Sequence, residues 1–168
     1  MKRAVAAVFA AAFMAAQPGQ AADVLDGLTA MELKYLVEGW GYQGFVHESP
    51  EELPQVVVST KDDAEKEFAV MLTGCEAGDA AFHEKHCKGL MFRTIVKPGH
   101  PVKPETYAKW NKGLNLARAY DVGEGRARLR WHVTIEGGVT REHIRAMTNR
   151  WREDLATFIE TVELAEWE

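Results

Sequence analysis

The sequence predicts a single α+β domain in which an antiparallel sheet is packed by helices. Two observations lead to this fold class. Some segments are β-branched or alternate in polarity, which is typical of strands, and others repeat apolar residues at helical spacing. Neither an internal repeat nor a linker divides the 168 residues, which favours one domain. The expected order of elements is α-β-β-β-α-β-β-α, and the stretch around Phe45 is a candidate for an extra strand.

The N-terminal half of the domain is expected to begin with a short helix after Thr29. Thr29 and Glu32 have the spacing of a capping box, in which a hydroxyl and a carboxylate satisfy free backbone N–H groups. Gly39 is expected to cap the other end of this helix. The strands expected next cover residues 55–60, 68–73 and 90–96, with a charged turn over residues 61–66.

The C-terminal half contains the clearest strand and the longest helix. A helix from Pro104 to about Leu116 and a strand over residues 117–120 come first. In the strand expected over residues 126–135, apolar and polar side chains alternate, which predicts one buried and one exposed face. Thr140 is expected to cap the last helix, whose apolar residues recur at intervals of three and four. This core-facing stripe comprises Ile144, Met147, Trp151, Leu155, Phe158 and Val162.

The N-terminus has the pattern of a secretory signal peptide. Lys2 and Arg3 precede an uncharged apolar run over residues 4–16, and a helix-breaking Pro-Gly pair follows. The run is too short to cross a bilayer, which needs about 20 apolar residues. We therefore expect export with cleavage and no stable insertion into the membrane afterwards.

Cleavage is expected after Ala21, because Gly19 and Ala21 supply the small residues that a cleavage site requires. Cleavage after Ala22 is the near alternative. Residues 22–168 would then form the mature domain, either periplasmic or secreted. The removed segment, residues 1–21, holds two bases and no acids, so the net charge changes from −5 to −7. This acidic balance argues against nucleic-acid binding.

Residues suited to catalysis are scarce in this sequence. The two serines, Ser49 and Ser59, lie in no nucleophile elbow. Gly123 and Gly125 occur without the third glycine and the helix of a dinucleotide-binding loop, and there is no phosphate-binding loop. We therefore predict no catalytic residue, no cofactor and no enzymatic activity.

Cys75 and Cys87 enclose a short loop that also contains His83 and His86. In an exported protein, two cysteines that bound a small loop more often form a disulfide. The alternatives are free thiols and a metal site built from both cysteines and both histidines, since zinc accepts such ligands. The spacing fits no standard zinc finger, and the adjacent His86 and Cys87 are awkward joint ligands. A periplasmic protein that binds a metal or small ligand with this loop is therefore the alternative function.

Three arginines alternate along the polar face of the strand expected over residues 126–135. They are Arg126, Arg128 and Arg130. Such a stripe could bind phosphate or an acidic partner. The plainer interpretation is a solvated strand face with salt bridges in an acidic protein. Asn111 could likewise belong to a recognition patch beside Trp110. The more common arrangement is that a tryptophan such as Trp110 lies in the core and that an asparagine such as Asn111 bonds to a neighbouring backbone group.

Several short motifs, in their order and spacing, resemble the YbjN family. The motifs are Trp110-Asn111, the segment 116–121, Gly137-Gly138-Val139-Thr140 before a helix with Trp151 and Phe158, and the earlier segment 36–42. The cysteine pair before an apolar strand also matches, and the resemblance covers about residues 28–162. The family is usually described as a sensory-transduction regulator, with a fold similar to type III secretion chaperones. The resemblance implies a non-enzymatic regulatory module that binds an unidentified polypeptide or a second copy of itself.

Overall fold

The computed structural model describes residues 24–47, 53–60, 63–77, 81, 84–113 and 115–165, without the side chains of residues 63–65. Its elements in chain order are β1 (Val24–Leu25), α1 (Ala30–Gly39), β2 (Gln43–His47), β3 (Gln55–Thr60), β4 (Asp63–Cys75), β5 (Cys87–Val96), α2 (Pro104–Lys112), β6 (Arg118–Asp121), β7 (Ala127–Thr134), β8 (Val139–Thr140) and α3 (Arg141–Glu163).

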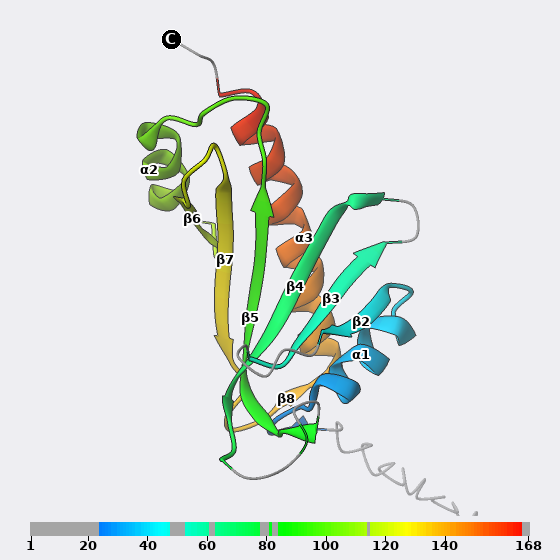
Figure 1. The fold of residues 1–168 in the computed structure, drawn as a ribbon. Coiled ribbons are helices and arrows are strands. Elements are labelled where there is room, and N and C mark those ends of the chain that lie inside the picture. Colours follow the sequence, from blue (N-terminus) through cyan, green and yellow to red (C-terminus); the bar gives the residue numbers. More distant parts are fainter. Residues whose placement is uncertain are drawn as a thin grey trace, which may run out of the picture.

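A six-stranded antiparallel sheet forms the centre of the described fold, in the order β2-β3-β4-β5-β7-β6. The long helix α3 lies across one face of this sheet, while α1 lies beside β2 and α2 beside β6 (Figure 1). β1 and β8 form a separate two-stranded pair, with Val24 opposite Thr140. The predicted α+β domain with an antiparallel sheet is confirmed. The extra strand near Phe45 is also present, as β2.

Both predicted helix caps are formed by side-chain hydroxyls. The backbone N–H of Glu32 donates to Thr29 Oγ1 at 3.1 Å, and the N–H of Thr29 donates to Glu32 Oε2 at 2.8 Å. At the start of α3, the N–H of His143 donates to Thr140 Oγ1 at 3.1 Å. Such caps satisfy N–H groups that have no partner inside a helix, so they fix where α1 and α3 begin.

The stripe predicted on α3 is the centre of the core, because all of its apolar residues are buried. Trp151 lies between Phe68 of β4 and Phe92 of β5, with ring centroids 6.0 and 5.7 Å away. Further along α3, Phe158 meets the edge of the Trp110 ring at 5.2 Å. One helix therefore packs on the middle strands and on α2 at once, which joins the halves of the chain into one core.

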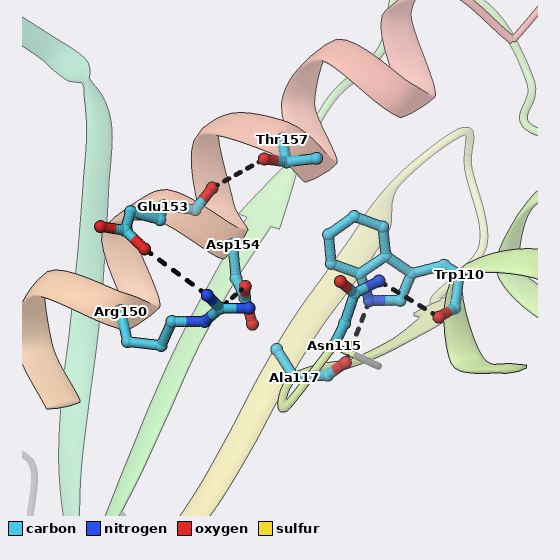
Figure 2. Close-up of polar contacts among 7 residues, drawn as sticks. All are labelled: Trp110, Asn115, Ala117, Arg150, Glu153, Asp154 and Thr157. Carbon is cyan, nitrogen blue, oxygen red and sulfur yellow. Dashed lines mark hydrogen bonds and ion pairs between the residues drawn. The ribbon is translucent and has the colours of Figure 1, made fainter. Parts of the chain in front are cut away.

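The second helix is shorter than the sequence predicted. It ends at Lys112 and not near Leu116, because the N–H of Gly113 turns back to close the last turn. The side-chain Nδ2 of Asn115 then donates to the Trp110 carbonyl at 3.3 Å (Figure 2). These bonds satisfy carbonyl groups that a longer helix would have used, and they direct the chain into β6.

Two other boundaries differ from the predictions. β4 begins at Asp63, inside the segment predicted as a charged turn, because pairing with β3 continues to Thr60 opposite Asp63. The first helix continues through Gly39, and the left-handed backbone conformation occurs at Gly41, with φ of 93°.

α3 also buries a carboxylate that its apolar spacing did not indicate. Asp154 is 4% exposed, and its Oδ1 lies 3.3 Å from Nε of Arg150 one turn earlier. The same guanidinium reaches Glu153 at 3.6 Å (Figure 2). Pairing within one helix allows the acid to be buried without a partner from the sheet. Neither α3 nor any other described helix is long and apolar enough to cross a membrane.

Candidate binding face

The two faces of β7 differ as its alternating sequence predicted. Leu129 is buried and Trp131 half-buried beneath α3, where Trp131 stacks on Phe92 at 5.5 Å. Arg128 and Arg130 lie on the opposite face, which none of the described helices covers (Figure 1). We call this second face the open face of the sheet.

Three arginines occupy directly paired positions on neighbouring strands of the open face. Arg130 of β7 lies opposite Arg93 of β5 on one side and opposite Arg118 of β6 on the other. Paired residues share one face of a sheet, with Cβ atoms about 4.5–5.5 Å apart. We call Arg93, Arg130 and Arg118 the arginine row. It concentrates positive charge in a chain whose net charge is −5.

The side chains of the arginine row reach different neighbours. Arg93 Nη2 donates to Oε1 of the buried Gln55 on β3 at 3.0 Å. Arg118 Nη1 donates to the backbone carbonyl of Asn111, near the end of α2, at 2.8 Å. Arg130 lies between them and is exposed. The outer arginines are thus held by the fold, and the central one is accessible to a partner.

Arg128 adds a fourth guanidinium group to the open face. It is paired with Tyr120 of β6, and its guanidinium lies 5.9 Å from the centre of the Tyr120 ring. The contact is a cation–π interaction. Arg128 Nε is buried with no hydrogen-bond partner among the described residues, and an unmade bond of this kind costs about 1–3 kcal/mol. The Arg128 guanidinium thus packs on the Tyr120 ring while its Nε makes no hydrogen bond to the described residues.

The open face also carries apolar side chains. In register with the arginine row, Phe45, Val57 and Ala69 lie on β2, β3 and β4. Phe45 is 59% exposed, and Ile95 on β5 is 43% exposed. A partner that covers the whole face therefore meets guanidinium groups on one side and apolar side chains on the other.

His132 is fixed on the open face by a contact that spans three strands. Thr73 of β4 and Nε2 of His132 on β7 are 3.0 Å apart, across β5. β5 lies between these two strands, and its Gly89 is paired with Thr73. A Cβ at Gly89 would collide with the Thr73 hydroxyl. Gly89 is therefore required here for space.

Two of the four predicted binding residues lie apart from the arginine row. Arg126 belongs to the β6–β7 hairpin, where its guanidinium pairs with Glu124 at 3.0 Å. Asn111 donates through Nδ2 to the Ala119 carbonyl at 2.7 Å and accepts the Ala119 N–H at 2.9 Å. The Asn111 amide thus pairs with the edge strand β6 as a neighbouring strand would. The other two, Arg128 and Arg130, share the open face.

Arg93 and Arg118 are the residues of the row that the sequence analysis missed. The phase of β5 could have placed Arg93, because Leu90 and Phe92 of this strand are buried and Arg93 follows in alternation. Nothing local to any strand indicates the register that sets Arg130 between the other two arginines. That register depends on pairing between distant segments.

Cys75 and Cys87 form a disulfide between paired positions at one end of β4 and β5, with Cα atoms 3.8 Å apart. Both sulfur atoms are therefore used, and the thiolates of the alternative metal site exist only in the reduced chain. His86 packs its ring against Gly27, and His83 lies outside the described residues. Among the residues that the structure describes, no three His, Cys, Asp or Glu side chains are arranged to hold a metal ion.

Two groups outside the arginine row have shifted pKa values. The pKa of His100 is raised because the carbonyl of Glu163 at the end of α3, and then that of Pro101, stabilise the protonated ring. The pKa of Tyr107 is raised by burial and by the negative charge of Asp121. The first shift therefore follows from hydrogen bonds to backbone carbonyls, and the second from burial beside a carboxylate.

Comparison with known proteins gives a family and a fold. The YbjN family model, described as "Putative bacterial sensory transduction regulator", matches residues 32–164. Among solved structures, the chain is similar to that of YbjN from E. coli, described as a putative transcription regulator, with a TM-score of 0.53 and 11% identity. This likeness covers 84% of this chain and 92% of that chain, and at such identity it concerns the fold alone. No curated protein matches.

Proposed function

Because the chain belongs to the YbjN family, we propose that it is a non-enzymatic regulatory module that acts by binding an acidic polypeptide partner on its open face. The description of the family as a sensory transduction regulator supports a regulatory role. The single observation that carries the binding role is the arginine row. Like charges at directly paired positions repel one another, and the central Arg130 is exposed on the open face.

An acidic partner would relieve the repulsion between these guanidinium groups. Guanidinium groups pair with carboxylates in a planar, two-bond geometry, and such bonds are stronger than those between neutral groups. Charges at the edge of an interface chiefly set the rate of association and the choice of partner. The apolar side chains beside the row, such as Phe45 and Ile95, would add buried area to the same contact. We therefore expect a partner segment with both carboxylates and apolar residues.

We also propose that this module works outside the cytoplasm, after removal of residues 1–21. That segment lies outside the described residues, and every described element begins at Val24 or later. Cleavage after Ala21 would therefore remove no residue of those elements. N-terminal sequencing of the exported protein should begin at Ala22. A protein that keeps Met1 and stays in the cytoplasmic fraction would contradict export.

Site-specific photo-crosslinking in the living cell tests the binding role. Benzoylphenylalanine would replace Thr134, which is exposed at the end of β7 on the open face, and would replace Arg145 on α3 as a control. We expect a crosslinked adduct from position 134 and none from position 145. Adding Arg118→Glu and Arg130→Glu together should abolish the adduct, because two positive charges of the row become negative.

Three outcomes would overturn the proposal. An adduct that persists after both charge reversals would show that the arginine row does not hold the partner. An adduct that forms equally from position 145 would show no preference for the open face. An adduct made of two copies of the chain would replace the separate partner with self-association.

A further inference from the structure

The sheet splits at the end opposite the disulfide. The ladder between β4 and β5 ends at Ala69 opposite Arg93. Beyond this pair, β5 stays with β7 as far as Val96 opposite Ala127, and β4 stays with β3, where Phe68 pairs with Val58. Figure 1 shows the two strands spreading apart over α3. Each strand therefore turns one edge, with its backbone N–H and C=O groups, toward the gap.

A cleft of about 780 Å³ occupies this split. Phe68 of β4 and Ile159 of α3 give it an apolar lining, and Ile95 stands at its mouth with 43% of its surface exposed. One polar contact crosses the cleft near its narrow end, where Thr94 Oγ1 donates to the Glu67 carbonyl at 3.1 Å. We call this space the β4–β5 cleft.

The described side chains that line the β4–β5 cleft carry three positive and two negative charges. Lys66, Arg93 and Lys97 line it, together with the carboxylates of Glu67 and Glu163. The arginine row begins at Arg93, so the positive field of the open face continues into the cleft. An occupant with negative charge is therefore favoured over one with positive charge.

We propose that the β4–β5 cleft binds an extended acidic segment of the partner polypeptide as an added strand on β5. A strand edge that is not paired offers a row of hydrogen-bonding groups, which an extended peptide can pair with. In such a segment, alternate side chains would enter the apolar lining near Ile159, and the carboxylates between them would lie on the open face beside Arg93. This inference rests on the proposed binding of an acidic polypeptide and names the conformation in which it is bound.

The backbone edges distinguish this occupant from a compact small molecule. A small molecule of suitable size would fill the apolar lining between Phe68 and Ile159. It would leave without a strand partner the N–H and C=O groups of β5 that face the gap, which alternate with those bonded to β7. A peptide satisfies both the apolar lining and the edge.

A peptide selection with hydrogen-exchange measurement tests this assignment. The full chain would be used to select from a phage-displayed library of random dodecapeptides, and the best peptide would be made synthetically. We expect selected peptides that alternate apolar and acidic residues. Binding should slow hydrogen exchange of the backbone amides at residues 94–97, and a proline placed centrally in the peptide should weaken binding about tenfold, because proline removes a strand donor.

A matched pair of variants locates the peptide. Ile95→Glu places a negative charge at the mouth of the cleft and should weaken binding about tenfold. Leu116→Glu makes the same change at a similarly exposed leucine, 49% exposed and outside the cleft lining, and should leave binding unchanged. Equal effects of the two variants would overturn the assignment, as would slowed exchange at residues other than 94–97. A proline peptide that binds as well as its parent would overturn strand addition.

The cleft and the arginine row can fail separately. If Arg118→Glu with Arg130→Glu abolishes crosslinking in the cell but no peptide is enriched by selection, the row holds its partner and the cleft assignment is wrong. If a selected peptide binds and Ile95→Glu weakens it, but crosslinking in the cell persists after Arg118→Glu with Arg130→Glu, the cleft binds extended segments and the proposed function of the open face is wrong.

Discussion

Trp151 of α3 and Phe92 of β5 lie with ring centroids 5.7 Å apart, and each is at most 1% exposed. Because the helix rests on the sheet through this pair, Trp151→Ala should leave a large cavity. Truncation of a buried aromatic residue costs about 3–5 kcal/mol, a large share of the about 5–15 kcal/mol that stabilises a domain. The midpoint of urea unfolding should fall accordingly.

Trp151→Phe is the matched control for that truncation. The indole Nε1 of Trp151 has no hydrogen-bond partner among the described residues, so its removal breaks no such bond. The phenyl ring keeps most of the contact with Phe68 and Phe92. We expect a clearly smaller loss than for Trp151→Ala, because the phenyl ring leaves a smaller cavity. Equal losses for the alanine and phenylalanine variants would show that this packing is not what stabilises α3 on the sheet.

The disulfide should contribute measurably to stability. Cys75 and Cys87 are separated by 12 positions, and closing a loop of that size is worth about 3 kcal/mol in the chain-entropy treatment. Cys75→Ala with Cys87→Ala should therefore lower the free energy of unfolding by about this amount. A thiol assay on the denatured, unreduced protein should find no free sulfhydryl. Two reactive thiols per chain would contradict the disulfide.

Asn111 should be a structural residue of the edge strand. Asn111→Ala would leave both backbone groups of Ala119 without their present partner, at a cost of about 1–3 kcal/mol. Asn111→Asp keeps the acceptor for the Ala119 N–H but sets a carboxylate oxygen against the Ala119 carbonyl, so at neutral pH its loss of stability should be at least as large as that of Asn111→Ala. Thermal melts of the three proteins check this order. An unchanged melting temperature for Asn111→Ala would mean that the hydrogen bonds between Asn111 and Ala119 do not stabilise the edge of β6.

His100 should make stability depend on pH. Its two ring nitrogens lie 3.1 Å from the Glu163 carbonyl and 3.2 Å from the Pro101 carbonyl, and only the protonated ring donates to both. Since this raises the pKa of His100, the stabilisation is complete below the ordinary pKa of histidine and is lost as pH rises through the raised value. The difference in melting temperature between wild type and His100→Gln should shrink from about pH 5 to about pH 8. A constant difference would contradict this role.

The sequence predicted features that depend on nearby residues. The stripe on α3, the caps at Thr29 and Thr140 and the two faces of β7 all follow from spacing within one segment, and each is confirmed. The shortened α2 shows the limit of such spacing, because Gly113 ends the helix although apolar residues continue beyond it. Periodicity locates a face more reliably than it locates an end.

The candidate site depends on contacts between distant segments, so less of it could be predicted. Arg128 and Arg130 were visible as alternating residues of one strand. The position of Arg130 between Arg93 and Arg118 requires the register of three strands, and that register is set by core packing along their full lengths. The β4–β5 cleft likewise exists because β4 follows β3 beyond Ala69, which no local pattern indicates.

Titration of the purified chain with poly-L-glutamate at neutral pH, by calorimetry, tests the role of the arginine row most directly. Arg130→Ala and Arg145→Ala each remove one exposed positive charge, so the net charge changes equally in both. We predict that Arg130→Ala weakens binding about fivefold, or ~1 kcal/mol, with an unchanged melting temperature, while Arg145→Ala binds like wild type. Equal affinity in all three proteins, or equal weakening in both variants, would contradict the assignment of the open face as the binding face.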